Sequence, residues 1–341
     1  MYKLRIIFLV LMLIGFACQA QNKIDKQGRR QGHWIKTDTD GSRLFEGNFE
    51  DGKEVGVFNY YYPDGTLKIR NTFTVPGRYC KHEAYDKKGR LIATGYYNQH
   101  NRDSIWNFYN TEGKLVKTAG YRMGVKQGLH IVFNSNGDTA EVASWNDNHR
   151  HGRWWKRLGE KAYITGYYEK GLMQGHLKEY DNNGKLLRDC LYKDGVKDGR
   201  SRYYENGTLT IDETWSQGSL ADRKILIRCD GDKWQSVFGI AYLLPKGSNG
   251  TLIYLNDGSK LICKENIEVI NERLGHEMFV LIDRKQRVTA NMSAIMGITK
   301  DSDGRDIIDL QPTPPFTIFP DDECLKMVRS LNRIDQLDER E

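Results

Sequence analysis

The most regular feature of the chain is a repeating pattern of aromatic, polar and glycine positions between residues 30 and 215. Each copy has an aromatic residue, a few polar residues, Gly, usually an apolar residue, and then a short run rich in Tyr, Phe, Val and Thr. One glycine per copy marks the period: Gly41, Gly65, Gly89, Gly113, Gly137, Gly159, Gly184 and Gly207. These glycines recur at a spacing of roughly 24 residues, which indicates a repeated supersecondary unit.

A second glycine precedes the first by about nine residues in most copies. It occurs as Gly32, Gly56, Gly128, Gly152, Gly175 and Gly199, while His82 and Ser104 stand near the expected places in the other two copies. Asp-Gly and Asn-Gly between short β-prone runs are hairpin turns, because Gly adopts positive φ without a Cβ clash. Each copy is therefore predicted to be one β-hairpin. A single hairpin cannot bury its apolar face, but stacked hairpins share one aromatic seam.

The period stops near Asp222, and the remaining residues have a different pattern. Two helices are expected, at 265–274 from its apolar spacing and at 321–331 with Asp321 as its cap. Asp257-Gly258 predicts a hairpin turn. Strands are expected at 225–229, 237–244, 251–255, 260–263, 278–282 and 287–290. The predicted fold class is mainly β: an elongated single-layer array of about eight β-hairpin repeats over 21–220, followed by a small α+β domain over 221–341.

Residues 1–20 have the pattern of a signal peptide. Lys3 and Arg5 precede an apolar run from Ile6 to Ala17, which is short for a permanent membrane span. Cleavage after Ala20 fits the small-residue rule. The alternatives are a lipoprotein processed at Cys18, which would hold the protein to a membrane by a lipid anchor, and a retained anchor helix. All three place the rest of the chain outside the cytoplasm, so a periplasmic or extracellular protein is expected.

Composition and charge narrow the class of protein. The 341 residues have a mean hydropathy of -0.66 and are 28% charged and 11% aromatic, which excludes a multispanning membrane protein and a disordered chain. Residues 21–220 carry 32 Lys and Arg against 25 Asp and Glu, a net +7, whereas 221–341 carry 17 against 20, a net -3. The cysteines show no Cys-x-x-Cys pair. A Cys229–Cys263 or Cys263–Cys324 bridge and buried free thiols both remain open.

The repeats resemble the MORN-repeat variant family, including the YwqK-type proteins commonly called antitoxin components. The resemblance extends over the whole periodic stretch, 30–215, and rests on eight copies in phase. It implies an elongated hairpin array used for protein interaction, with no catalytic residues to carry across. An antitoxin role does not fit an exported protein, because the toxin would be cytoplasmic.

The C-terminal region resembles, over roughly 100 residues, the LytTR-type DNA-binding domain of response regulators, through Leu252–Leu261, Glu272-Arg-Leu274, Phe279-Val280 and Asn291–Ile295. This chain departs from that family at the expected DNA contacts. Acidic residues, Asp321-Asp-Glu323, stand where a basic pair is usual. DNA affinity depends on Lys and Arg neutralising phosphates, so a LytTR-like fold without a basic contact surface is expected, and nucleic acid is not an expected partner.

The densest basic and aromatic cluster lies at His149–Arg157, and its candidate binding residues are Arg153, Trp154, Trp155, Lys156 and Arg157. Such residues can stack sugars or bind anionic envelope polymers, although Trp154 also fits the apolar seam. Strand alternation places Trp154 and Trp155 on opposite faces. His149 and His151 have no third metal ligand nearby. No nucleophile elbow, phosphate loop or zinc motif occurs, so the expected function is contact with a protein partner, without a metal, cofactor or enzymatic activity.

Overall fold

A computed structural model describes residues 21–229, 231–275, 278–314 and 317–338, with side chains as far as Ser330. The predicted leader, including Cys18 and Ala20, lies outside the described residues. The described chain is mainly β, as predicted. It divides into two compact units, Met1–Met173 and Gln174–Glu341, and each is described by itself.

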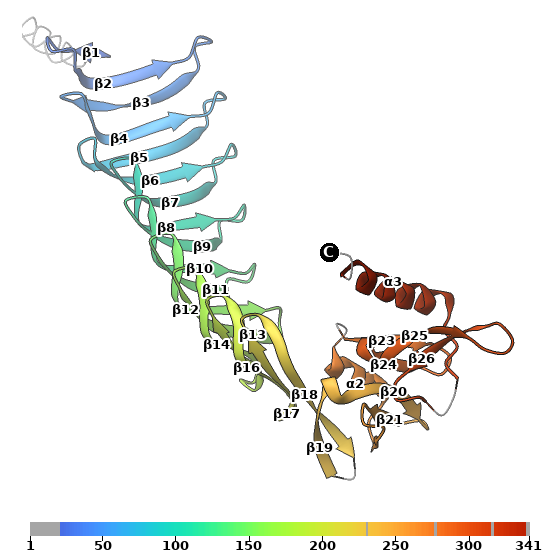
Figure 1. The fold of residues 1–341 in the computed structure, drawn as a ribbon. Helices are drawn as coiled ribbons and strands as arrows, with labels where there is room; N and C mark the ends of the chain where they lie inside the picture. The colour runs from blue at the N-terminus through green and yellow to red at the C-terminus, as the bar shows by residue number, and fades with distance from the viewer. Residues whose placement is uncertain (1–20, 230, 276–277, 315–316, 339–341) are drawn as a thin grey trace, which may run out of the picture. The chain divides into compact units, whose positions relative to one another are not determined.

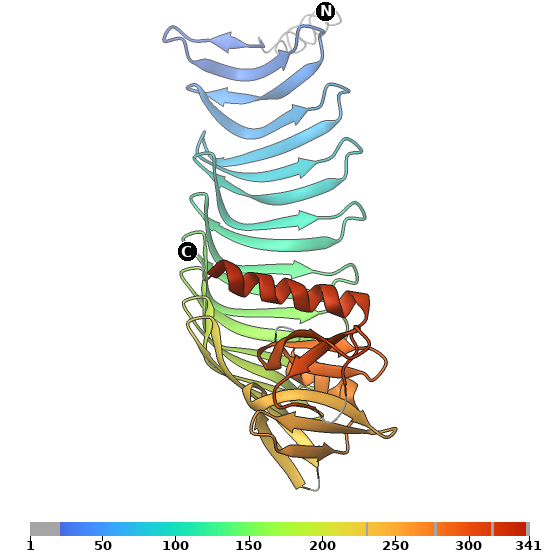
Figure 2. The ribbon, with the colours of Figure 1, turned by 45° about the vertical axis from the view of Figure 1, so that its right-hand side comes forward.

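The first unit is a single layer of antiparallel strands in which each strand pairs with the next one along the chain (Figures 1 and 2). The prediction of repeated hairpins is confirmed. The strands are β1 (Lys23–Ile24), β2 (Arg30–Thr37), β3 (Arg43–Glu50), β4 (Lys53–Tyr61), β5 (Leu67–Val75), β6 (Tyr79–Tyr85), β7 (Leu91–Asn98), β8 (Asn101–Tyr109), β9 (Leu115–Arg122), β10 (Val125–Phe133), β11 (Thr139–Asn146), β12 (His149–Leu158) and β13 (Ala162–Glu169).

The eight period-defining glycines all have positive φ, from +59° at Gly159 to +89° at Gly137. The turn at Gly113 shows how the local sequence builds the reversal. Asn110 Oδ1 accepts hydrogen bonds from the backbone N–H groups of Glu112 and Lys114, at 2.9 and 3.0 Å, while Gly113 N–H donates to Asn110 O. An Asn or Asp side chain at the turn start thus satisfies two backbone donors, which explains the recurring Asx-x-x-Gly spacing.

The second glycine of each copy lies at an irregularity inside a strand. Gly128 has φ +72°, and the β9–β10 register shifts between Lys126 and His130. This is the behaviour of a β-bulge, which Gly favours because one residue takes a left-handed conformation. In the copy that lacks this glycine at residue 104, Ser104 itself adopts φ +58°. The left-handed residue is therefore kept at Ser104 without a glycine, whereas no residue of β6, the other strand that lacks this glycine, has positive φ.

One bulky side chain per repeat fills a buried seam along one side of the sheet, called here the seam face. In the first unit these are Trp34, Phe58, His82, Trp106, His130 and Trp154. Small residues lie opposite several of them: Gly47 pairs with Trp34, Gly95 with His82 and Ala119 with Trp106. A Cβ on Gly95 would lie 2.3 Å from the ring of Trp106. The seam is therefore packed by alternating large and small residues across neighbouring strands.

The second unit begins with further hairpin strands that pair consecutively, from β14 (Leu172–Asp181) to β19 (Gly231–Ser236). The strands between are β15 (Leu186–Lys193), β16 (Val196–Glu205), β17 (Thr208–Ser216) and β18 (Ser219–Cys229). Pairing of β17 with β18 continues to Ile225, and Ile225 and Ile227 are also part of the apolar core of the C-terminal residues. Strand β18 thus belongs to both the hairpin sheet and the C-terminal core.

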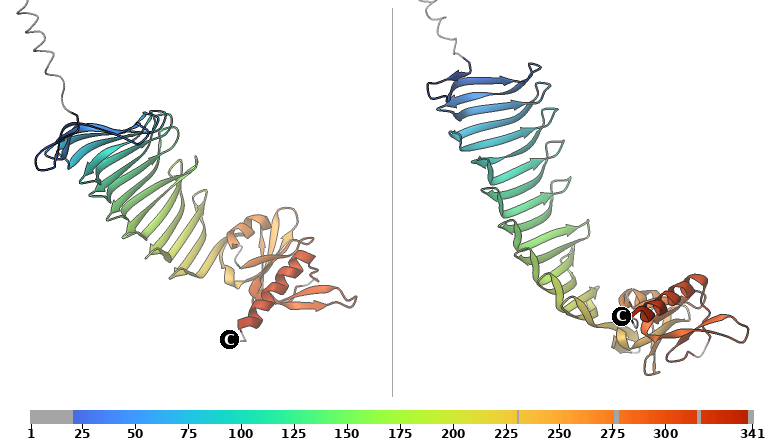
Figure 3. Two further views of the ribbon diagram at one scale, coloured as in Figure 1. Left: turned by 90° about the horizontal axis from the view of Figure 1, so that it is seen from above. Right: turned by 45° about the horizontal axis from the view of Figure 1, so that its top comes forward.

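The C-terminal residues form a five-stranded antiparallel sheet in the order β22-β21-β20-β24-β23, accompanied by two helices and a separate hairpin (Figures 1 and 3). One buried cluster joins this sheet to helix α2 and β18, and a second joins it to α3 and the hairpin β25–β26. The elements are β20 (Ile240–Lys246), β21 (Gly250–Leu255), β22 (Lys260–Cys263), α2 (Ile267–Leu274), β23 (Phe279–Asp283), β24 (Val288–Asn291), β25 (Ile295–Lys300), β26 (Asp306–Leu310) and α3 (Asp322–Asp338).

Most predicted C-terminal elements are present, with four differences: one strand begins later than predicted, strand β19 and the hairpin β25–β26 were not predicted, and helix α3 continues to Asp338, beyond the predicted end at residue 331. Residues 237–239 form a short 3-10 turn, η1 (Val237–Gly239), and strand β20 begins only at Ile240. Asn256 stabilises that turn, because its backbone and side-chain N–H groups donate to Gly239 O and Phe238 O. The hairpin β25–β26 was not predicted. Its turn at Asp301–Arg305 repeats the Asp-x-x-Gly-Arg sequence of Asp86–Arg90.

Candidate binding surfaces of the hairpin sheet

Strand alternation gives the sheet of the first unit a second face, called here the outer face, whose side chains point away from the seam. On β12 this alternation separates the predicted cluster. Trp154 and Lys156 lie on the seam face, and Arg153, Trp155 and Arg157 lie on the outer face. Trp154 is buried, and its Nε1–H donates to Glu141 Oε1 at 2.8 Å, so this residue packs in the seam. The structure therefore brings together three of the five predicted residues.

Aromatic and aliphatic side chains of β10, β11 and β13 surround these three residues. Trp155 lies opposite Val142 and Thr165 in the strand register. Its ring centroid is 6.0 Å from that of Tyr163, and the Arg157 guanidinium is 5.8 Å from the Trp155 ring. We call this surface the outer platform. Its members are Leu129, Ile131, Phe133, Val142, Arg153, Trp155, Arg157, Tyr163 and Tyr167.

Two properties distinguish the outer platform. It exposes large apolar side chains, with Leu129 57% and Tyr167 43% exposed, and Ile105 of β8 on the same face is 62% exposed. Its only charges are positive. Within the described part of the chain, neither Arg153 nor Arg157 has a carboxylate partner within ion-pair distance. The sequence pattern identified these arginines, but Leu129 and Tyr167 could be assigned to the same face only from the strand register.

On the seam face, cations lie against the aromatic rings. Arg102 is 4.5 Å from the centroid of Trp106, Lys126 Nζ is 4.4 Å from that of Trp145, and the Arg150 guanidinium is 5.4 Å from that of Tyr168. Arg150 also binds Glu141 at 2.8 Å. This row of cations was not predicted from the sequence. The sequence nevertheless contains a pattern that could have predicted it, because the cations recur at the period of the repeat, as Arg78, Arg102, Lys126 and Arg150.

Two seam positions hold histidines where other repeats hold aromatic residues. His82 is 7% exposed, and its Nδ1 lies 2.8 Å from Asn71 Oδ1. Burial, together with the nearby Arg102 charge, lowers the pKa of His82 to about 4. Burial likewise lowers the pKa of His130, which stacks on Trp145 with ring centroids 5.1 Å apart. Both rings are therefore neutral seam residues at neutral pH.

The other predicted features lie apart from these surfaces. His149 Nδ1 contacts Asp147 O at 2.7 Å, and the described residues contain no group of three side chains suited to hold a metal ion. The cysteines among the described residues are free thiols, including Cys229 and Cys263, which belong to one apolar cluster. Among the C-terminal residues, Arg284 is ion-paired with Asp321 at 3.0 Å and also with Glu323.

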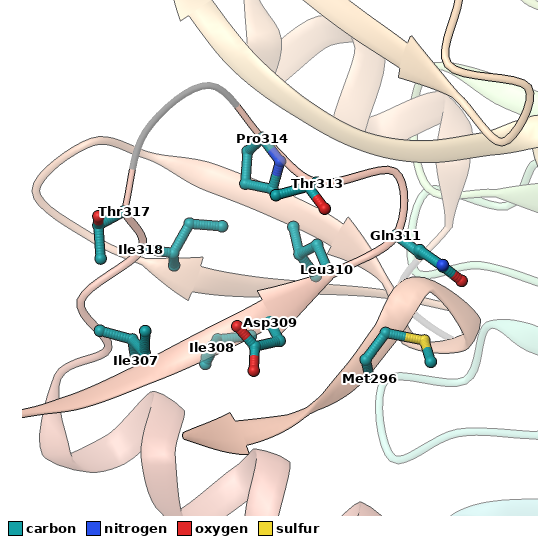
Figure 4. A pocket seen from close by; sticks show the side chains of 10 residues that line it. All are labelled: Met296, Ile307, Ile308, Asp309, Leu310, Gln311, Thr313, Pro314, Thr317 and Ile318. Carbon is teal, nitrogen blue, oxygen red and sulfur yellow. The ribbon is translucent and has the colours of Figure 1, made fainter. Parts of the chain in front are cut away.

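A pocket of about 510 Å³ lies between the hairpin β25–β26 and the segment that carries Gln311, Thr313 and Thr317 (Figure 4). Its described lining is apolar or uncharged except for Asp309. A single carboxylate among such residues provides neither an acid–base pair nor a set of metal ligands. The outer platform and the seam-face cations therefore remain the stronger candidate surfaces.

The sequence matches no known family profile and no curated protein. Among solved structures, the chain is similar to a chain in the crystal structure of TcdB2-TccC3-TEV, at 12% identity and a TM-score of 0.15. The match covers 83% of this chain and spans 15% of the length of that one. No helix within the described residues combines the length and apolarity that crossing a bilayer requires.

Proposed function

We propose that this chain is an exported, non-enzymatic interaction protein whose hairpin repeats dock a protein partner on the outer platform. The observation that carries the proposal is the gathering of Trp155, Tyr163 and Tyr167 with Arg153 and Arg157 on one sheet face. Trp, Tyr and Arg are the residues most enriched at the energetic centres of protein interfaces. The exposed leucine and isoleucine beside them extend the same surface.

The charges of the outer platform indicate the chemistry of the partner. Arg153 and Arg157 lie on the same face of β12 on either side of Trp155, so their positions are about 13 Å apart along the strand. Both are exposed, and neither is ion-paired among the described residues; the exposed Glu169 lies two residues from Tyr167, at the end of β13. A partner that presents Asp or Glu side chains around an apolar centre would satisfy both arginines. The predicted leader places that partner in the cell envelope or outside the cell.

Site-specific photo-crosslinking tests this proposal. A benzophenone amino acid at Tyr167 is expected to give one discrete protein adduct in intact cells. The paired substitution Arg153→Glu and Arg157→Glu is expected to abolish the adduct, because like charges would then face the acidic partner. Lys156→Glu is the matched control, since Lys156 is exposed on the same strand but lies on the seam face. An adduct that persists in the paired variant, or the absence of any protein adduct, would refute the proposal.

A further inference from the structure

The seam face carries an alternating row of aromatic and cationic side chains across seven successive strands. Strand register places Tyr97 opposite Arg102, Tyr121 opposite Lys126, and Trp145 opposite Arg150. Tyr168 of β13 follows, opposite the bulge at Gly152. We call these residues the aromatic–cation ladder: Tyr97, Arg102, Tyr121, Lys126, Trp145, Arg150 and Tyr168. It lies on the opposite face of the sheet from the outer platform.

Each cation of the ladder lies over the ring of the following strand. Arg102 is 5.6 Å from the Tyr121 centroid, Lys126 is 4.4 Å from Trp145, and Arg150 is 5.4 Å from Tyr168. The four rings are half-buried, so each still presents an edge or part of a face to solvent. The rings and the cations are thus held at regular positions, one on each successive strand of the sheet.

The ladder has unneutralised positive charge. In the described part of the chain, Arg102 and Lys126 have no carboxylate within ion-pair distance, whereas Arg150 is bound to Glu141 at 2.8 Å. A hollow of about 160 Å³ lined by Arg78, Cys80 and Tyr97 adjoins the start of the ladder, and Arg78 is exposed there. Glu54 lies one repeat before Arg78, at one end of the run of cations without carboxylate partners, and Glu141 lies at its other end, beside Arg150.

The spacing of the ladder follows from sheet geometry. Neighbouring strands lie about 4.8 Å apart, so like residues two strands apart repeat about every 10 Å. A ligand that matches this row must alternate a ring with an anion at the same period. The disaccharide unit of a linear polysaccharide has a comparable length. A sugar ring packs on an aromatic side chain, and a uronate carboxylate binds Arg or Lys.

We propose that the aromatic–cation ladder binds a linear acidic polysaccharide with one carboxylate per disaccharide. Arg102 and Lys126 bind successive carboxylates, and Tyr121 and Trp145 contact the intervening sugars. An extended peptide fits less well, because its same-side residues repeat about every 7 Å. A stacked nucleic acid strand carries a phosphate about every 3.4 Å, which is about three charges for each cation of the ladder along the same length. A flat lipid surface would not reach Arg102 and Lys126 fully, because both side chains are half-buried.

Calorimetric titration of the purified chain with hyaluronan oligosaccharides tests this proposal, because hyaluronan has one glucuronate per disaccharide. Affinity is expected to rise by about tenfold from the tetrasaccharide to the octasaccharide, since linked sites bind as one multivalent ligand. Polygalacturonate of equal length, which carries a carboxylate on every sugar, is expected to bind at least about tenfold more weakly, because every second carboxylate would lie against an aromatic ring instead of a cation. Equal or weaker binding of the hyaluronan octasaccharide would overturn the proposal.

Single-residue variants distinguish specific binding by the ladder from nonspecific electrostatic attraction between the oligosaccharide and the protein. Arg102→Gln and Lys126→Gln are each expected to weaken octasaccharide binding by about tenfold, the usual effect of losing one charged hydrogen-bonding group. Arg122→Gln removes the same charge at the exposed end of β9, outside the ladder, and is expected to leave affinity unchanged. Arg102→Lys keeps the charge and tests whether a loss in Arg102→Gln reflects misfolding, which thermal melting also reports.

Three outcomes would reject the ladder. These are an equal loss in Arg122→Gln, tighter binding of a single-stranded oligonucleotide or an acidic peptide, and binding to vesicles of anionic lipid in place of the oligosaccharide. The photo-crosslinking experiment at Tyr167 concerns the outer face and reads out protein adducts. Failure of one experiment therefore leaves the other proposal standing.

Discussion

The guanidinium of Arg273 on α2 donates a 2.8 Å hydrogen bond to Glu205 at the end of β16, although 68 residues separate them in the sequence. Arg273 is only 3% exposed, and it also donates to Leu226 O and Glu265. Burial disfavours the charged guanidinium, but the carboxylates of Glu205 and Glu265 outweigh that effect and raise the pKa of Arg273 above its ordinary value. The last hairpins and the C-terminal domain are thus joined through a buried cation, where the sequence predicted a simple boundary near residue 220.

Replacing Arg273 by Met is expected to lower the free energy of unfolding of the second unit by about 3 kcal/mol, because Glu265 would lose its partner at 3.0 Å and keep only the more distant Arg228, at 3.9 Å. Denaturant unfolding followed by intrinsic fluorescence measures this change. Arg284→Met is the control. Its ion pairs are exposed, so a much smaller loss is expected. Equal losses in the two variants would show that the buried network adds nothing.

Gly95 is expected to tolerate no larger side chain. An alanine Cβ there would lie 2.3 Å from the Trp106 ring, which the seam holds at 1% exposure. Overpacking of this kind costs about 1–3 kcal/mol. Thermal unfolding of Gly95→Ala measures the loss, and Thr94→Ala on the outer face of the same strand is the control. A Gly95→Ala variant as stable as the parent chain would contradict the packing of the seam.

His82 predicts a pH dependence of stability. Because its folded-state pKa of about 4 lies below the ordinary value of 6.5, the unfolded chain binds the proton more tightly. The stabilisation is therefore fully present above pH 6.5 and is lost as the pH falls towards 4. A loss of roughly 2 kcal/mol is expected over that range, after allowance for solvent screening.

Denaturant unfolding at several pH values between 4 and 7 measures the effect of His82. In His82→Gln, which cannot titrate, the slope of stability against pH is expected to decrease. The slope that remains is assigned in part to His130, whose pKa is also lowered. An unchanged slope would show that folding does not lower the pKa of His82.

The turn at Gly113 predicts a dependence on backbone conformation alone. Its φ is +78°, and a Cβ there would meet no atom within 4 Å. Gly113→Val is expected to destabilise the chain by about 2 kcal/mol, because a β-branched residue strongly disfavours left-handed φ. Gly113→Asn adopts this region more readily and should lose less than about 1 kcal/mol. Thermal melting distinguishes the two, and equal losses would indicate a steric cause.

The sequence alone identified only part of the outer platform. The cluster at His149–Arg157 included the outer arginines and Trp155 because these residues follow one another on one short strand. Leu129 and Tyr167 join that surface from β10 and β13, and their contribution depends on register. The ladder was missed because its cations and rings come from different strands, although both recur at the repeat period.

The sequence by itself determined the repeat and its turns, because an Asx residue and a Gly at fixed spacing satisfy the backbone of each reversal without distant residues. The tertiary structure alone decided which side chains share a face, how β18 serves both the sheet and the C-terminal core, and which carboxylates meet Arg273. Those features depend on pairing between strands and on burial, so they arise only when segments distant in sequence pack together.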